Sequence, residues 1–397
     1  MELFDNERLN LDDLSPNPPS LPDDEVNAKY VEGHVRIVTE QARYPLPSIA
    51  NMVESDDYEL NPEFQRRHRW NDEKKSRLIE SFIMNVPIPP IFLYEDEFSH
   101  YEVMDGLQRL TAIHEFYKDR LVLEGLEKWP ELNGRKYSEL PNQVRRGVDR
   151  RYLSSIILLQ ETAKDPKEAQ RLKQMVFERI NSGGIKLEPQ ETRNAIYNGP
   201  LNQMCIKLAR NEYLCKAWGI PVVSHKQVAS GDLPPELMRN KRYRKMKDVE
   251  LVLRFFAYRQ RLRLQSGALR DYLDEYLKFG NLYSDDVLNK LKTLFQDTVE
   301  LVYKTFGKRA FWLYRKRETG WIWYKRPTTV IYDPMMWAFS RYLDRADSII
   351  GKKEAFRKKI KSFYKNNYDE FKGKYTNRAN IRQRNELFND FVDQILG

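Results

Sequence analysis

The sequence predicts an α/β domain over residues 34–200, followed by a mostly α-helical domain over residues 201–397. Between residues 71 and 117 the apolar pattern gives the order helix, strand, strand, glycine turn, helix. A chain of 397 residues also exceeds one average domain. Beyond the α/β domain, apolar residues recur at helical spacing, most clearly in 248–264, 285–306 and 334–350. We therefore expect a small mixed sheet with helices, and then a second unit made of helices.

The elements of the α/β domain have recognisable starts and stops. A short strand is predicted over 34–38. Further along the chain, Asn71 is a suitable N-cap for a helix that begins directly after it. A proline-rich segment ends that helix and leads into a strand, 91–94. A second strand, 101–104, continues directly into a glycine turn and a helix over 107–117. This last junction is where the chemistry is expected.

The junction contains the segment Asp105-Gly106-Leu107-Gln108-Arg109. A strand that ends in Asp-Gly before a helix brings free backbone N–H groups and the positive end of the helix dipole together, which suits a phosphate. Arg109 adds a bidentate cation, and Gln108 can orient a water or a phosphate oxygen. Asp105 can hold a divalent metal or accept a proton. An ordinary structural Asp-Gly turn explains the same spacing equally well.

Two further segments have residues suited to a ligand. Gln65-Arg66-Arg67-His68-Arg69-Trp70 places arginines beside an aromatic ring, which suits a nucleotide or a nucleic-acid backbone, although a solvated basic loop is the alternative. The segment 177–184 ends a predicted helix over 168–181 in Asn-Ser-Gly-Gly, where backbone amides can approach a ligand closely. A plain helix C-cap is the alternative for the second segment.

Taken together and in order, these segments resemble one family, the N-terminal domain of GmrSD restriction enzymes, also called domain-of-unknown-function family 262. The resemblance covers roughly residues 40–200. The family's Phe-Gln-Arg…Trp block, its Leu-Ile-Glu-Ser helix and its Pro-Ile-Pro-Pro strand entry stand here at 64–70, 78–81 and 87–90. Its hallmark Asp-Gly-Gln-Gln-Arg-Leu-Thr, its Phe-x-Arg-Ile-Asn-x-Gly-Gly and its Gln-Glu-x-Arg-Asn-Ala stand at 105–111, 177–184 and 190–195.

The resemblance implies a ParB-like α/β fold that binds and hydrolyses a nucleoside triphosphate (NTP) with a divalent cation such as Mg²⁺. It implies a role in prokaryotic anti-phage or restriction-type defence against modified or foreign DNA. By the same resemblance Asp105, Gln108 and Arg109 would be catalytic, and Asp105 would also be the metal ligand. The residues that would line the nucleotide pocket are Gln65, Arg66, Gly106, Thr111, Asn181, Gly183, Gly184 and Arg193.

The chain departs from the family pattern at two points. Leu107 stands where the hallmark has its first glutamine, so hydrolysis is in question if that position touches nucleotide; the apolar face of the helix also suits a leucine. Relatives with nuclease activity carry a C-terminal HNH-type domain, which needs a histidine as general base. The last histidine here is His225, so an HNH nuclease in the C-terminal half is not expected.

The charge distribution favours a polyanionic partner. Residues 1–60 carry a net charge of −10 and the remainder +19, and a basic body can release counterions from a phosphate backbone. The segment 309–326 interleaves six aromatic residues with six Lys or Arg, as a strand-tracking surface would; an amphipathic hairpin packed on the helices is the alternative. The residues predicted to contact nucleic acid are Arg67, Arg69, Arg315, Lys316, Arg317, Lys325 and Arg326.

Other features concern location rather than chemistry. Residues 1–33 form an acidic leader with four prolines, which we expect to be disordered. No run of eighteen apolar residues and no secretory signal is present, so we expect a cytoplasmic protein without a membrane span. Cys205 and Cys215 fit no metal spacing, which is consistent with reduced, buried thiols.

Three functions remain open from the sequence. The first is an NTP-hydrolysing sensor or regulator of a defence system that acts on DNA, with or without a separate nuclease partner. The second is a non-enzymatic DNA-binding or clamp module that uses nucleotide only as a ligand. The third is a nuclease with an acidic site that includes Asp248 and Glu250. Self-association is compatible with each of them.

Overall fold

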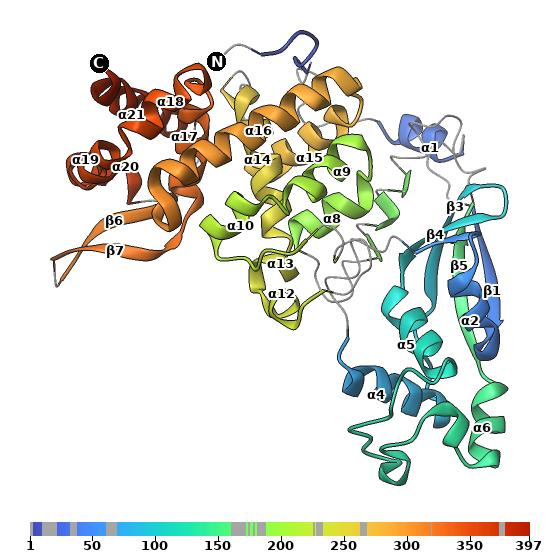
Figure 1. Ribbon diagram of the computed structural model, residues 1–397. Helices are drawn as coiled ribbons and strands as arrows, with labels where there is room; N and C mark the ends of the chain where they lie inside the picture. The colour runs from blue at the N-terminus through green and yellow to red at the C-terminus, as the bar shows by residue number, and fades with distance from the viewer. Residues whose placement is uncertain are drawn as a thin grey trace. The chain divides into compact units, whose positions relative to one another are not determined.

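The protein is described here from a computed structural model, which covers the chain in segments. The described residues are 3–9, 22–31, 38–60, 70–159, 172–173, 175–177, 179–180, 188–224, 227, 233–262, 268–318, 320–372 and 378–397. The chain forms two compact units (Figure 1). We call residues 18–187 the sheet unit, and residues 1–17 with 188–397 the helical unit. The segment from Glu188 to Pro200, which the sequence-based division places with the α/β domain, lies in the helical unit.

The sheet unit is built on a mixed five-stranded sheet. Its strands lie in the order β1-β5-β3-β4-β2, in which the pairs β1/β5 and β3/β4 are antiparallel and the pairs β5/β3 and β4/β2 are parallel. The strands are β1 (Thr39–Pro45), β2 (Tyr58–Glu59), β3 (Ile91–Glu97), β4 (His100–Asp105) and β5 (Tyr152–Leu158). The helices are α1 (Asp23–Val31), α2 (Leu46–Glu54), α4 (Asp72–Ile83), α5 (Leu107–Tyr117) and α6 (Asn142–Asp149), with short 3₁₀ turns at Pro130–Leu132 and Tyr137–Glu139.

The helix cap and the order of elements predicted around the glycine turn at residue 106 are confirmed. The Asn71 side chain accepts a hydrogen bond from the N–H of Lys74 at 3.2 Å, as an N-cap should. β3, β4 and α5 follow in the predicted order. Both strands are longer than predicted, since the predictions covered only residues 91–94 and 101–104. The strand predicted over 34–38 lies outside the described residues except for Val38, and β1 begins at Thr39.

The core of the sheet unit lies between the sheet and helices α2, α4 and α5. α2 and α4 both pack against α5. The apolar stripe of α5, which includes Leu110, Ile113 and Phe116, is fully buried there with Ile91 of β3. Because the helix that begins at Leu107 is fixed along its length by this core, the position of its first turn is fixed as well.

The helical unit contains α8 (Pro189–Ile196), α9 (Pro200–Leu208), α10 (Glu212–Trp218), α12 (Pro235–Arg239), α13 (Lys241–Arg244), α14 (Lys247–Arg261), α15 (Leu269–Gly280), α16 (Asp285–Phe306), α17 (Thr329–Phe339), α18 (Ala346–Gly351), α19 (Lys353–Asn366), α20 (Tyr368–Phe371) and α21 (Arg378–Leu396). Two 3₁₀ turns, Gly307–Arg309 and Leu343–Arg345, and one hairpin interrupt them. The hairpin consists of β6 (Trp312–Arg317) and β7 (Gly320–Pro327) and extends away from the helices of its unit (Figure 1).

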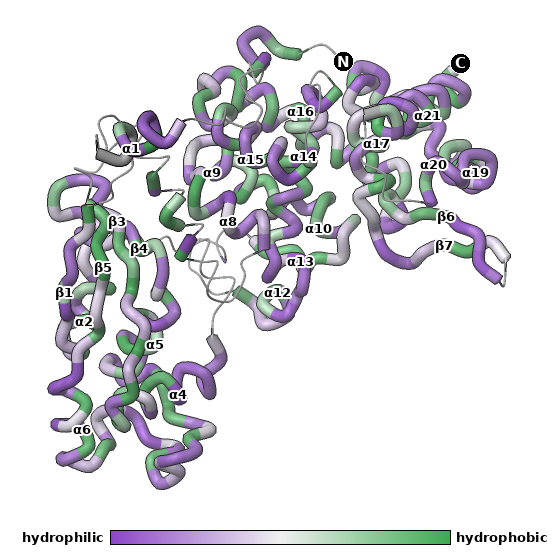
Figure 2. Tube along the Cα trace, turned by 180° about the vertical axis from the view of Figure 1, so that it is seen from behind, coloured by the Kyte–Doolittle hydropathy of each residue, from purple (hydrophilic) through white to green (hydrophobic). Residues whose placement is uncertain are grey.

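The helical character predicted beyond residue 201 is confirmed, with one difference. The stripe predicted over 334–350 is divided between α17 and α18, because α17 ends at Phe339 and the Ser340 hydroxyl donates back to the carbonyl of Trp337 at 2.8 Å. α19 is largely hydrophilic along its length (Figure 2), and it buries only one face, which carries Phe356, Ile360, Phe363 and Tyr364.

A short part of the acidic leader packs in the helical unit. The Glu7 side chain is fully buried and paired with Arg259 at 2.6 Å, and the backbone carbonyl of Glu7 accepts hydrogen bonds from Gln260 and Tyr283. Within the part of the chain that the structure covers, no helix is apolar enough over a sufficient length to cross a bilayer.

Candidate nucleotide site

The turn between β4 and α5 requires a glycine at position 106. The Gly106 φ angle is 103°, a left-handed value that side chains disfavour. A Cβ atom at this position would also lie 2.3 Å from Cγ2 of Ile91. Conformation and space therefore both restrict the position to glycine, and the backbone can reverse direction tightly between Asp105 and Leu107.

Asp105 and Arg109 meet across this turn. Arg109 Nη2 lies 2.6 Å from Asp105 Oδ2, and the same nitrogen lies 3.3 Å from the carbonyl oxygen of Pro90. The Asp105 side chain is 40% exposed, whereas that of Arg109 is 14% exposed. The buried Arg109 Nε has no acceptor among the described residues. In this pair the Asp105 carboxylate is accessible to solvent, whereas the Arg109 guanidinium is largely buried.

The pairing of β3 and β4 is irregular next to Asp105. Phe92 pairs with Asp105, but the next residue, Leu93, pairs with Val103, so β4 has one extra residue at its end. Such bulges re-aim a side chain where a strand terminates. This irregularity lies at the point where the chain leaves the sheet and enters the α5 turn.

Gln108 ties the turn to the segment before α4. Its Oε1 accepts a hydrogen bond from the backbone N–H of Trp70 at 3.0 Å. The Trp70 ring in turn lies beneath the ammonium of Lys74, 4.6 Å from its centroid. Trp70 is the last residue of the Phe-Gln-Arg…Trp block, so one end of this block is held beside the Asp105 turn.

The remaining hallmark residues lie on α5. Leu107 is half-buried and packs against the core of the sheet unit, which gives its side chain a structural role at the position where the family pattern has glutamine. Thr111 lies one turn further along the helix and is also half-buried. The predicted site residues Gln65, Arg66, Arg67, Arg69, Asn181, Gly183 and Gly184 lie outside the described residues.

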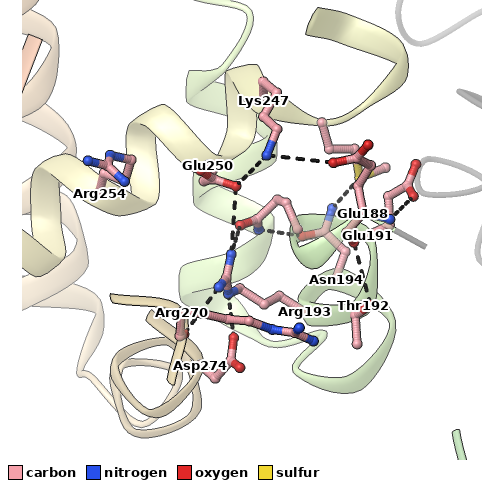
Figure 3. A network of polar contacts seen from close by, with 12 residues as sticks. Glu188, Glu191, Thr192, Arg193, Asn194, Lys247, Glu250, Arg254, Arg270 and Asp274 are labelled. Carbon is pink, nitrogen blue, oxygen red and sulfur yellow. Dashed lines mark hydrogen bonds and ion pairs between the residues drawn. The ribbon is translucent and has the colours of Figure 1, made fainter. Parts of the chain in front are cut away.

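Arg193 lies in the other unit, on α8. Its side chain is 2% exposed, and its Nε donates to Asp274 at 2.5 Å. Its Nη1 donates to Gln190 at 3.2 Å and its Nη2 to the carbonyl of Arg270 at 3.2 Å (Figure 3). The Gln-Glu-x-Arg-Asn-Ala motif is therefore a buried polar network within the helical unit, and the role of Arg193 in a nucleotide pocket stays a prediction.

The acidic residues considered for a nuclease are committed to ion pairs. Asp248 is fully buried and paired with Arg210, and Glu250 lies 3.1 Å from Lys247 and 3.9 Å from Arg193. Across the described residues, no group of three or more His, Cys, Asp or Glu side chains is arranged to hold a metal ion. A divalent cation at the Asp105 turn would therefore need oxygen donors beyond a described carboxylate cluster, such as water, substrate phosphates, or amide and backbone oxygens.

Two features of the sheet unit had no signal in the sequence analysis. The first is the carbonyl of Pro90, which gives the Pro-Ile-Pro-Pro segment a direct contact with Arg109. The second is an ion pair between Glu102 of β4 and Lys173, whose side chains are 12% and 13% exposed. Burial raises the pKa of Glu102, and the charge of Lys173 opposes that rise. Neither contact has a local pattern, because the partners are far apart in the chain.

One family model matches the sequence. Residues 49–198 match the family model described as GmrSD restriction endonuclease, N-terminal domain. The match covers less than half of the chain, and it includes the Asp105 turn and α8. No curated protein and no solved structure matches the chain.

The resemblance predicted from the motifs is thus confirmed over residues 49–198. The α/β fold followed by a helical part is confirmed as well. Residues 49–198 are therefore similar to the N-terminal domain of GmrSD restriction endonucleases.

Proposed function

We propose that the sheet unit binds a nucleoside triphosphate with Mg²⁺ at the Asp105 turn and hydrolyses it, and that this activity regulates a restriction-type defence system acting on DNA. The observation that carries the proposal is the Gly106 turn, which joins an accessible carboxylate, a largely buried arginine and the start of an eleven-residue helix. Hydrolysis by this chain would regulate a separate nuclease, since Asp248 and Glu250, the acidic residues considered for a nuclease, are engaged in ion pairs.

The first turn of α5 supplies the phosphate-binding groups. Its leading N–H groups have no partner inside the helix, and the helix dipole is positive there. Arg109 lies in the first turn of the helix and can donate two parallel hydrogen bonds to phosphate oxygens. In the structure it donates to Asp105 and Pro90, so a phosphate would compete with Asp105 for the same guanidinium.

Asp105 is the group that would change role when phosphate arrives. An Arg109 that turns to the phosphate leaves the Asp105 carboxylate free to accept a proton from water or to hold a cation. Mg²⁺ is commonly held by one or two carboxylates, water and substrate phosphates, which suits a turn with a single accessible carboxylate. When bound, the cation would neutralise charge that develops on the phosphate oxygens.

Gln108 fits a positioning role. Its oxygen is engaged with the backbone of Trp70, so a rotation about its side chain is restricted. A restrained amide can orient a phosphate oxygen or water with little entropy loss on binding. Gln108 also couples the turn to the basic block that ends at Trp70.

A second function, nucleotide binding without turnover in a DNA-binding clamp, is favoured by one observation. The Asp105 carboxylate already accepts a hydrogen bond from Arg109 at 2.6 Å, so the oxygen that would take a proton from water is engaged. If Arg109 keeps this pairing in the nucleotide complex, the phosphate is held but not hydrolysed.

Phosphate release separates the two functions. We would measure it for the full chain with Mg²⁺ and each of the four NTPs, with and without duplex DNA, for the native protein, Asp105→Asn and Arg109→Lys. The control is Asp56→Asn, which removes an exposed carboxylate from the same unit. We expect both site variants to lose about 100-fold or more in rate and the control to lose none.

Each alternative has its own result in this experiment. Tight nucleotide binding without phosphate release by the native chain would establish the clamp function. Phosphate release that is unaffected by both site variants would exclude the Asp105 turn as the site. A supercoiled plasmid in the same reactions tests for a nuclease, because nicking by the chain alone would revive the third function.

A further inference from the structure

The β6–β7 hairpin has two different faces. In its register Tyr314 pairs with Trp323 and Lys316 with Trp321, so these side chains share one face. Arg315 pairs with Ile322, which places both on the opposite face. Because side chains alternate along a strand, Arg317 and Tyr324 share the face of Arg315 and Ile322.

The first face is packed against the helices of the unit. The Trp323 and Trp321 rings contact Tyr364 and Tyr368 edge-on, with centroids 6.2 and 5.2 Å apart. The ammonium groups of Lys361 and Lys365 lie 5.9 and 5.8 Å from the Tyr314 and Trp321 centroids. These rings are engaged with the protein, so they are not a free platform on which nucleic-acid bases can stack.

The second face is a cluster of arginines around one ring. The guanidinium carbons of Arg315 and Arg326 lie 3.8 and 4.5 Å from the Tyr324 centroid, so Arg326 lies on this face as well. Arg317 and Arg326 are exposed, and Ile322 is 42% exposed beside them. We call Arg315, Arg317, Ile322, Tyr324 and Arg326 the arginine face.

No carboxylate among the described residues neutralises the arginine face. Over the described part of the chain, none of its three arginines has a carboxylate within ion-pair distance, and the hairpin carries one acidic residue, Glu318 at its tip. Burial and the neighbouring charges of Arg317 and Arg326 lower the pKa of Arg315. Burial and the neighbouring charge of Arg326 lower the pKa of Arg242 on α13.

We propose that the arginine face of the β6–β7 hairpin is a duplex-DNA contact that inserts as a two-stranded ribbon into the major groove. The major groove of B-DNA is about 12 Å wide and admits such a ribbon. Arginines on it can reach phosphates and guanine edges, and an exposed apolar side chain such as Ile322 can contact a thymine methyl group. One face of the hairpin packs on α19 and α20, whereas Arg317, Ile322 and Arg326 on the other face are exposed. The strands project beyond the helices of their unit (Figure 1).

The choice of duplex DNA follows from the same two faces. Single-strand binding depends on aromatic platforms, and here the large rings are packed on α19 and α20. Duplex RNA has a deep, narrow major groove that side chains cannot read. The inference deepens the proposed action on DNA and does not depend on the nucleotide site of the other unit.

The test is fluorescence anisotropy of the full chain with labelled duplex DNA, the same sequence as a single strand, and the matching RNA duplex, over a series of salt concentrations. The test variant combines Arg315→Gln, Arg317→Gln and Arg326→Gln. The control combines Lys353→Gln, Lys358→Gln and Lys359→Gln, which removes the same charge from exposed positions of α19. Near-ultraviolet circular dichroism checks that the tryptophans of the hairpin keep their packing.

We expect the native chain to bind duplex DNA more tightly than the other two nucleic acids. The test variant should bind the duplex about tenfold more weakly or worse, and its salt slope should fall by about 2 to 3, at about 0.9 for each phosphate that an arginine no longer neutralises. The control should keep its slope. Equal reductions in both variants, or none in the test variant, would overturn the proposal, and so would tighter binding of the single strand or equal binding of the RNA duplex.

If the triple variant unfolds, the salt dependence of duplex binding is measured for Arg317→Gln alone. This residue is exposed near the hairpin tip, and its replacement should lower the slope by about 1. Phosphate release is measured in the same preparations. Duplex binding through the arginine face without phosphate release would reject the hydrolysis proposal and keep this one, and phosphate release without duplex binding through this face would do the opposite.

Discussion

Two arginine–carboxylate pairs, one in each unit, differ in how far they are removed from solvent. The Arg109–Asp105 pair has side chains 14% and 40% exposed and lies at the start of a helix. The Arg193–Asp274 pair has side chains 2% and 29% exposed, and Arg193 makes further hydrogen bonds to Gln190 and Arg270. An accessible carboxylate can exchange its partner for a ligand at little cost, whereas a buried arginine with every donor engaged cannot.

The comparison shows that the role of an arginine in a motif depends on its burial and its partners in the fold, and not on the motif alone. In the first pair one partner faces solvent beside a helix N-terminus, so a phosphate can displace it. In the second pair, the Arg193 guanidinium connects α8 to α15 through hydrogen bonds. Its removal should therefore lower the stability of the helical unit.

The largest expected effect is on the buried pair. Arg193→Met should destabilise the helical unit by about 3 to 5 kcal/mol, because Asp274 is left as a mostly buried carboxylate without its partner. Calorimetry of the full chain would show this as a lower unfolding temperature for the helical unit. The control is Arg270→Met, an exposed arginine close to the same carboxylate. An unchanged transition with lost nucleotide binding would place Arg193 in the nucleotide pocket after all.

The next effect concerns the turn of the exposed pair. Gly106→Ala should destabilise the sheet unit by about 2 to 4 kcal/mol, since it adds a left-handed alanine and a clash with Ile91. Gly134→Ala is the matched control, because Gly134 has a φ angle of 84° and open space around its Cβ direction. The control should lower the free energy of unfolding only through the left-handed backbone conformation of the new alanine, by about 1 to 2 kcal/mol. Equal costs in urea unfolding would show that Ile91 does not restrict the turn.

A smaller effect should appear on changing pH. Burial raises the pKa of Asp274 and the charge of Arg193 opposes this rise, so Arg193→Met should raise it further. A carboxyl with a raised folded-state pKa destabilises the fold once pH exceeds the unfolded value, and protonation removes that penalty. The stability deficit of Arg193→Met should therefore shrink as pH falls from neutral towards 4, by at most about 1.4 kcal/mol per pH unit. A deficit that does not vary with pH would assign the loss to packing.

The smallest expected effect on stability is that of the exposed pair itself. Asp105→Asn should change the unfolding free energy of the sheet unit by no more than about 1 kcal/mol, since Asp105 is 40% exposed and the asparagine oxygen can still accept a hydrogen bond from Arg109. The same variant is expected to lose phosphate release. Urea unfolding measured beside the activity assay checks both, and a loss above about 3 kcal/mol would mean that this pair is structural, like the buried one.

Local sequence patterns predicted the parts of the site that depend on neighbours in the chain. The Asn71 cap, strands β3 and β4, the Asp-Gly turn and α5 all follow from residues within a few positions of one another. The contacts of Arg109 with the Pro90 carbonyl and of Gln108 with Trp70 join separate segments, so no local pattern could indicate them. The same holds for the ion pair between Glu102 and Lys173.

The hairpin shows a similar division. The alternation of arginines, lysines and aromatic rings predicted a basic hairpin, and both the nucleic-acid contact and the packed amphipathic hairpin were open. The register assigns the rings to the face packed on α19 and α20, so the packing alternative holds for that face. The arginine face is the part that stays available for a partner.

The sequence by itself determined the family resemblance, the Asp105–Arg109 turn and the order of sheet and helices, because each depends on residue identities at short or fixed spacing. Only the tertiary structure decided that Arg193 lies buried with Asp274 in the helical unit while Asp105 stays accessible in the sheet unit. The physical reason is that burial and ion pairing depend on which distant segments pack together, and a motif does not encode its distant partners.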